Sequence, residues 1–364
     1  MIEPVPEIRI SQPPIQRESA QSDDQPAANE AANEAASPIR QYLLSRGSSA
    51  FADRAFRWLM ILCGLSIFAI VLLILYALMV GSSLSWHKFG FGFFYQSFTD
   101  PDTLTKLYWD PVNERFSALP FIYGTLVSSA LALLIAVPLA IGVAIFLTEM
   151  CPGALRGPLA FLTELLAAIP SVIYGFWAVT VLVPLLRQDV NPVLVGLLGW
   201  TGLFVDNNPT GLGFVAAGVI LSIMILPIIS SLTREVMSAV PHSQREAVLA
   251  LGATRWEMIR MAVLRNARIG IVGSIILGLG RALGETMAVA MVIGNTPEIH
   301  RSLLSNGSSM AAVIANEYAE AVSDMHYSAL TELGLALFLV TIVVNIIAQL
   351  LVWAVTRGAP AQAR

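Results

Sequence analysis

Residues 57–80 read "RWLMILCGLSIFAIVLLILYALMV", and after Arg57 this stretch carries no charged side chain. A helix needs about 20 apolar residues to cross the hydrocarbon core of a bilayer, so the stretch predicts a transmembrane helix. The whole chain has the same character. Of its 364 residues, 56% are hydrophobic and only 13% are charged, whereas soluble domains average about 25% charged residues. The composition therefore indicates an integral membrane protein.

Five further apolar segments of similar length follow. The six segments cover residues 57–80, 119–148, 158–186, 211–233, 267–294 and 328–356. Their length argues against a β-barrel, whose strands would be about 10 residues long with alternating apolar and polar side chains. We therefore expect an all-α integral membrane fold with six transmembrane helices.

The segments outside the spans give the domain organisation. Residues 1–50 are rich in Ala, Glu, Gln, Ser and Pro, a composition that cannot form a core and predicts a disordered tail. Residues 51–118 hold the first span and a long loop. Residues 119–357 hold the other five spans, with an extended loop at 234–266, and residues 358–364 form a short second tail.

Arginine placement predicts the orientation. The side of the membrane that holds both termini carries Arg40, Arg46, Arg54, Arg57, Arg156, Arg234, Arg245, Arg255, Arg260, Arg265, Arg268, Arg357 and Arg364. The opposite side carries Lys88, Lys106, Arg115, Arg187 and Arg301. Because cytoplasmic loops hold an excess of Lys and Arg, we expect both termini in the cytoplasm.

The fifth apolar segment contains a pair of opposite charges, Arg281 and Glu285. In a continuous helix, residues four apart share one face and can form a salt bridge. A charged residue at the centre of a bilayer costs about 2.5–3.5 kcal/mol on insertion scales. The pair therefore either lines a pathway for a polar substrate or satisfies itself and fixes the register of the helix.

Nothing in the chain predicts its own nucleotide chemistry. A phosphate-binding loop ends in Gly-Lys-Ser or Gly-Lys-Thr, and the only lysines, Lys88 and Lys106, do not follow glycine. The four histidines lie far apart, so no metal site is predicted. We expect no cofactor in this chain and no enzymatic activity of its own, so that an ATP-driven process would require a partner chain to bind ATP and Mg²⁺.

The loop at 240–267 reads "VPHSQREAVLALGATRWEMIRMAVLRNA". Ser243 and Glu246 have the spacing of a capping box that begins a helix, and Gly252 separates it from a second helix. One interpretation is a pair of amphipathic helices on the lipid headgroups. The loop also resembles the EAA loop of ABC-importer permeases. That resemblance implies a coupling helix, with roles for Glu246, Ala247 and Gly252, that docks on a cytoplasmic ATPase.

Several positions of this loop differ from the usual EAA pattern. Val248 stands where the family often has Ala, Ala262 where Ile is common, and Arg265 where Pro is common. The resemblance therefore predicts a helix–turn–helix but leaves the geometry at the end of the second helix open.

Two further stretches resemble the phosphate-specific (Pst-type) permeases of type I ABC importers: "GLGRALGETMAV" at 278–289 and "ELLAAIPSVIYGF" at 164–176. The long first outer loop resembles the C-type subunit. The resemblance implies a six-helix permease in the bacterial inner membrane. It also implies a homologous A-type permease, an ATPase dimer and an extracytoplasmic phosphate-binding protein as partners, and no nucleic acid. Arg281 and Glu285 match the charged pair of that family's phosphate pathway.

Three residues of the third apolar segment remain ambiguous. Ser171 and Tyr174 either line the pathway or pack around the kink at Pro170. Glu164 is either an intramembrane charge or a carboxylate at the membrane interface.

Alternative functions also remain open. Molybdate, sulfate or phosphonate importers share the architecture. A secondary anion transporter would instead need ion-coupling carboxylates and often internal repeats, and a membrane sensor or scaffold would only bind partners. The outer loops carry about ten acidic residues against five basic ones. Such a surface does not attract free anions, so delivery by a binding protein fits an anionic substrate better than capture from bulk solution.

Overall fold

The computed structural model describes residues 50–99, 106–205 and 208–357. The predicted tails at 1–50 and 358–364 therefore lie outside the described residues, apart from Ala50. The chain divides into two units, Met1–Leu72 and Leu73–Arg364. Helix α2 (Ala50–Gly81) crosses this division, and the description below concerns the second unit.

The described residues of the second unit are mostly helical. Its helices are α3 (Ser83–Phe89), α4 (Leu119–Ile145), α5 (Gly153–Ala168), α6 (Ser171–Trp177), α7 (Val183–Leu185), α8 (Asn191–Leu198), α9 (Phe214–Ser238), α10 (His242–Ala250), α11 (Arg255–Met258), α12 (Arg265–Leu283), α13 (Met287–Val292), α14 (Met310–Glu317) and α15 (Asp324–Arg357). Two short 3-10 segments are η1 (Gly90–Phe94) and η5 (Gly199–Thr201), and four π-helical segments are η2 (Phe146–Met150), η3 (Ala178–Leu182), η4 (Leu186–Val190) and η6 (Ile259–Leu264).

Among the described residues, six helical stretches are long and apolar enough to span a membrane, which confirms the expected number. They are Phe51–Gly81, Leu119–Met150, Ser171–Thr201, Phe214–Ser238, Arg255–Leu283 and Asp324–Trp353. Two of the predicted boundaries were wrong. The third span was expected at 158–186, but the chain breaks before Ser171 and stays helical to Thr201. The fifth was expected to continue to residue 294, but α12 ends at Leu283.

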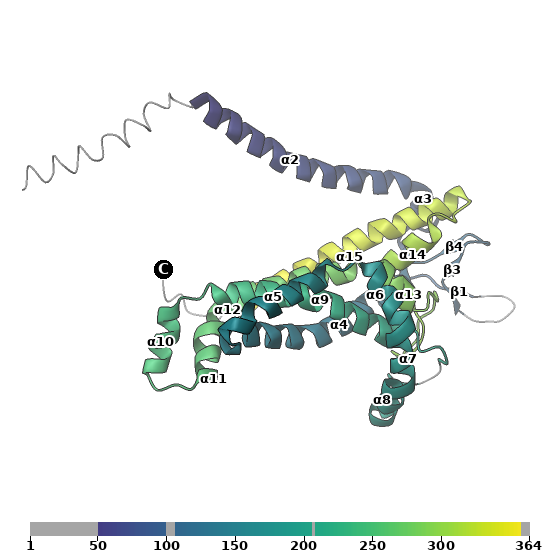
Figure 1. The fold of residues 1–364 in the computed structure, drawn as a ribbon. Coiled ribbons are helices and arrows are strands. Elements are labelled where there is room, and N and C mark those ends of the chain that lie inside the picture. The colour runs from purple at the N-terminus through teal and green to yellow at the C-terminus, as the bar shows by residue number, and fades with distance from the viewer. Residues whose placement is uncertain (1–49, 100–105, 206–207, 358–364) are drawn as a thin grey trace, which may run out of the picture. The chain divides into compact units, whose positions relative to one another are not determined.

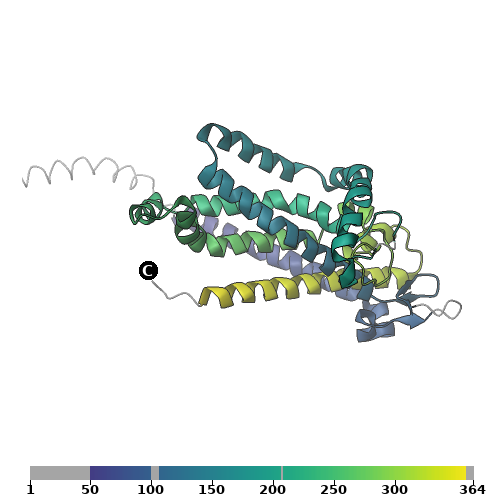
Figure 2. The ribbon, with the colours of Figure 1, turned by 90° about the horizontal axis from the view of Figure 1, so that it is seen from below.

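The long helices run side by side (Figure 2), with α9 packed against α4, α12 and α5. Small residues explain the close approach of α4 and α9. Ala132, Ala136 and Ala140 recur every four residues on α4 and are fully buried. On α9, a methyl group at Gly218 would lie 2.7 Å from Cβ of Leu131. In transmembrane bundles such small residues allow backbones to pack closely, and here the three alanines belong to the main core.

The two ends of the bundle differ (Figure 1). One end carries the α10–α11 loop and is called the α10 end below. The other end carries α14 and two short antiparallel sheets, β1 (Phe98–Thr99) with β2 (Lys106–Leu107) and β3 (Trp109–Asp110) with β4 (Arg115–Phe116). A separate aromatic core supports this second end, where the rings of Trp109, Phe116 and Phe121 make edge-to-face contacts. Most of the loop predicted to follow the first span is therefore structured.

Candidate functional site

The first feature of the site is a helix break between α5 and α6. Ile169 has an extended conformation, with φ −68° and ψ 130°, because a following proline disfavours the helical region. Pro170 also has no N–H group, so the carbonyl of Leu166 lacks the donor that residue 170 would supply in a continuous helix. The hydroxyl of Tyr174 donates a hydrogen bond to this carbonyl at 2.7 Å.

This hydrogen bond bears on the alternatives for Tyr174 and Ser171. Tyr174 is buried, and its hydroxyl donates a hydrogen bond to the Leu166 carbonyl at the helix break. This contact is part of the packing around Pro170. Ser171 is the first residue of α6 and is half-buried. Both residues nevertheless lie at the break itself.

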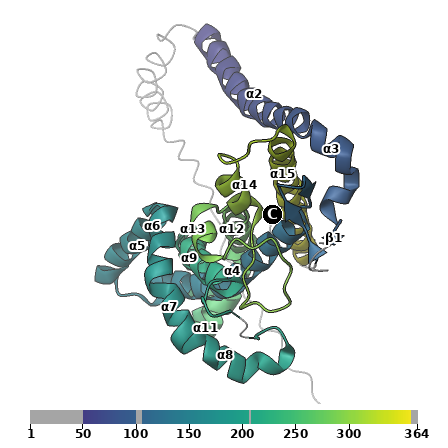
Figure 3. The ribbon, with the colours of Figure 1, turned by 90° about the vertical axis from the view of Figure 1, so that its right-hand side faces the viewer.

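A second break separates α12 from α13, between Leu283 and Met287. Glycine has low helix propensity, and Gly284 ends α12. Helix α13 then packs against α6, beside it in Figure 3. Gly175 permits this contact, because a methyl group there would lie 3.1 Å from Cα of Ala288. The two broken helices thus meet near the charged pair.

The break changes the geometry of Arg281 and Glu285. Arg281 is in the last turn of α12 and exposed on the isolated chain, whereas Glu285 is half-buried and beyond the end of the helix. Among the described residues, neither side chain forms an ion pair, including with each other. The expected helical i,i+4 salt bridge is therefore wrong, because Gly284 ends the helix between its two members.

This arrangement is suited to binding a small anion reversibly. Irregular backbone within a membrane span is tolerated where it is buried in protein or lines a water-filled cavity. In transporters such interrupted helices commonly form substrate sites. Arg281 offers a planar guanidinium that can contact two oxygens of an oxyanion, and no carboxylate in the described chain neutralises it.

The α10–α11 loop forms the predicted helix–turn–helix. Gly252 has φ +84°, a left-handed conformation that favours glycine, and it turns the chain from α10 toward α11. Glu246 and Ala247 are exposed. Leu251 and Trp256 are 88% and 60% exposed, so the loop presents apolar side chains together with the EAA residues.

The predicted capping box was wrong in position. Helix α10 begins at His242 after Pro241, so Ser243 already lies inside the helix and caps nothing. The capping box belongs to α11 instead. There the Thr254 hydroxyl accepts a hydrogen bond from the Glu257 N–H, while the Glu257 carboxylate accepts one from the Thr254 N–H.

The structure also contains an ion pair that the sequence analysis did not predict. Arg245 of α10 and Glu149 at the end of the second span form an ion pair at 3.1 Å, with side chains only 9% and 8% exposed. Arg245 also donates to the carbonyls of Val240 and Met237. The pair ties the exposed loop to the transmembrane bundle. The sequence offered two weak signals for this ion pair. Glu149 stands at the end of the second apolar segment, and Arg245 stands directly before Glu246.

The predicted residue Glu164 lies at the α10 end, where it forms an ion pair with Arg234 of α9. It lies on α5 five residues before Ile169, where the helix breaks. Within the described residues, no group of His, Cys, Asp or Glu side chains is arranged to hold a metal ion.

Comparison with known proteins places this geometry in context. Residues 136–358 match the family described as binding-protein-dependent transport system inner membrane component. The phosphate transport system permease protein PstC of Haemophilus influenzae is 45% identical over 294 residues, covering 80% of this chain and 90% of that protein. The PstC of Mesorhizobium japonicum is 47% identical over 277 residues, covering 75% and 81%.

A solved structure supports the fold. A chain of a bacterial ABC transporter involved in the import of the acidic polysaccharide alginate superposes with a TM-score of 0.51 at 18% identity. The match covers 85% of this chain and all of that chain. At this identity the likeness concerns the fold alone, which is that of a type I ABC-importer permease.

Proposed function

This chain belongs to the family of binding-protein-dependent transport system inner membrane components, and we propose that it is the permease subunit of an ATP-driven phosphate importer in the bacterial inner membrane. The observation that carries the proposal is the 45–47% identity to phosphate permeases over most of the chain. The chain itself is a transport subunit, and ATP with Mg²⁺ is bound by a partner ATPase.

The proposed orientation puts the α10 end in the cytoplasm. The arginine distribution supports it, since the α10 end carries most of the arginines and cytoplasmic loops are enriched in them. The ATPase dimer then docks on the α10–α11 loop, where the exposed Leu251 and Trp256 can enter an apolar groove. A homologous A-type permease completes the pathway, and the phosphate-binding protein docks at the opposite end.

Within the membrane, Arg281 is the proposed contact for phosphate in transit. The broken helices around it supply the irregular backbone of a pathway, and Glu285 beyond Gly284 places a negative charge nearby that limits how tightly an anion is held. Conduction requires sites that bind weakly enough to release.

The turn at Gly252 provides a test of the docking surface. In Gly252→Ala, the left-handed conformation at φ +84° becomes unfavourable by about 1 kcal/mol, so we expect less ATPase to co-purify with the permease. The matched control is Gly157→Ala in α5, where a methyl group would meet no atom within 4 Å and φ is not positive. Equal loss of ATPase in both variants would contradict the role of the turn.

Uptake tests the function itself. The chain is expressed with its partner subunits in cells that lack other phosphate importers, and uptake of radiolabelled phosphate is followed with molybdate, sulfate or a phosphonate as competitors. We expect saturable, ATP-dependent uptake that only unlabelled phosphate suppresses strongly. Suppression by another oxyanion at lower concentration would assign a different substrate. Uptake driven by an ion gradient without the ATPase would indicate a secondary transporter.

A further inference from the structure

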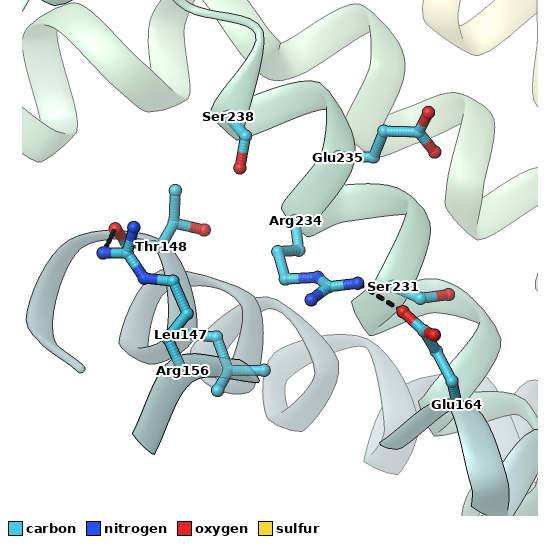
Figure 4. Close-up of a pocket in the computed structure, with 8 residues that line it drawn as sticks. All are labelled: Leu147, Thr148, Arg156, Glu164, Ser231, Arg234, Glu235 and Ser238. Atoms are coloured by element: carbon cyan, nitrogen blue, oxygen red, sulfur yellow. Dashed lines mark hydrogen bonds and ion pairs between the residues drawn. The ribbon is translucent and has the colours of Figure 1, made fainter. Parts of the chain in front are cut away.

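A cavity lined by charged side chains lies toward the α10 end of the bundle. It has a volume of about 460 Å³ and lies between η2, α5 and the last two turns of α9. Two arginines line it from different elements, Arg156 from α5 and Arg234 from α9 (Figure 4). The transport pathway described above uses neither of them.

Arg234 has an exchangeable partner. Its Nη2 donates to Oε1 of Glu164 at 2.6 Å, and the side chains are 23% and 55% exposed. Ion pairs accessible to water contribute little net stability, so another anion can replace the carboxylate without a large loss. The arginine is the more buried of the two.

Arg156 is the less satisfied of the two arginines. One of its nitrogens, Nη2, donates to the carbonyl of Thr148 at 2.6 Å, whereas a guanidinium has five N–H groups. It forms no ion pair with any residue that the structure describes. Figure 4 shows the hydroxyl-bearing Ser238 facing the space between the two arginines, while Glu235 extends from α9 on the side away from Arg156.

We propose that this cavity binds a phosphate group between Arg156 and Arg234, with Glu164 as the competing carboxylate. Guanidinium groups contact phosphate oxygens bidentately, and two of them on different walls can hold a tetrahedral oxyanion from two sides. The inference rests on the proposed function. With the α10 end in the cytoplasm, the cavity is a binding site that imported phosphate reaches as it leaves the membrane. The phosphate group of an anionic phospholipid has the same chemistry and is the other possible source.

Arginine footprinting distinguishes these sources. The assembled transporter, with phosphate uptake verified beforehand, is placed in nanodiscs of phosphatidylcholine and treated with phenylglyoxal. Modification of each arginine is followed by mass spectrometry, with and without millimolar inorganic phosphate, and again in nanodiscs that contain phosphatidylglycerol. We expect inorganic phosphate to slow modification of Arg156 and Arg234 by about tenfold. The exposed Arg265, outside the cavity, is the matched control and should react at an unchanged rate.

Two variants sharpen the test. Glu164→Gln removes the competitor, so half-maximal protection should require about two- to fivefold less phosphate. Arg234→Gln should abolish phosphate protection of Arg156, whereas Arg234→Lys should retain part of it.

Protection by phosphatidylglycerol alone would support the site and assign it to lipid. If neither phosphate source protects the two arginines in a complex that transports phosphate, the inference is wrong while the proposed function stands. A complex that fails to take up phosphate would instead overturn the proposed function.

Discussion

Replacing Arg281 with glutamine should lower phosphate uptake by the assembled transporter by roughly 30- to 5,000-fold. The pair in question is the proposed contact between the Arg281 guanidinium and phosphate in transit. Truncating one member of a hydrogen-bonded charge pair costs about 2–5 kcal/mol, and each 1.36 kcal/mol in a barrier changes a rate tenfold. The structure leaves this guanidinium without a carboxylate partner among the described residues, at a point where two helices are interrupted. Its positive charge is thus available to an anion that would otherwise meet an apolar surface.

The controls separate charge from geometry and from assembly. Arg281→Lys keeps the charge but loses the bidentate fork, so we expect uptake between that of the wild type and that of the glutamine variant. Arg301→Gln removes an exposed arginine from the segment between α13 and α14 and should transport normally. Co-purification of all subunits shows that the complex has formed. Wild-type uptake by an intact Arg281→Gln complex would remove this residue from the pathway.

The number of spans could be predicted because the length of an apolar segment is a local property of the sequence. The positions of the breaks depend on more than that. Pro170 marked the first break, since proline cannot donate the missing hydrogen bond. Gly284 did not mark the second, because Gly280 and other glycines in the same segment stay helical. The end of α12 goes together with the packing of α13 against α6. This contact joins segments that are far apart in the sequence, so local patterns do not predict it.

The candidate site shows the same division. Ser243 and Glu246 have the same capping-box spacing as Thr254 and Glu257, and only the start of α10 at His242 decides between them. Glu246, Ala247 and Gly252 lie on the exposed α10–α11 loop, and their role in ATPase docking stays a prediction. Arg245 and Glu149 are 96 positions apart, so their contact could not be read from local spacing.

Removing the carboxylate of Glu149 should have the second large effect. In Glu149→Ala, the buried guanidinium of Arg245 loses its counter-charge, and an uncompensated buried charge costs about 3–5 kcal/mol. We expect a clear drop in the thermal unfolding midpoint of the purified permease. Since Arg245 lies on α10 beside the proposed ATPase surface, we also expect ATP hydrolysis to persist in the complex while phosphate uptake falls.

A double variant separates stability from coupling. Arg245→Met combined with Glu149→Met replaces both charges with apolar side chains, a change that is often neutral or stabilising for a buried pair. The recovery in unfolding midpoint should be partial, because the carbonyls of Met237 and Val240 lose their donor. As a matched exposed pair, Lys88 and Glu114 lie 2.9 Å apart with side chains 40% and 44% exposed, so Glu114→Ala should change stability by less than about 1 kcal/mol. If the double variant regains both stability and full uptake, the pair only stabilises the fold. If stability returns but uptake stays low, the ion pair transmits the movement of α10 to the second span.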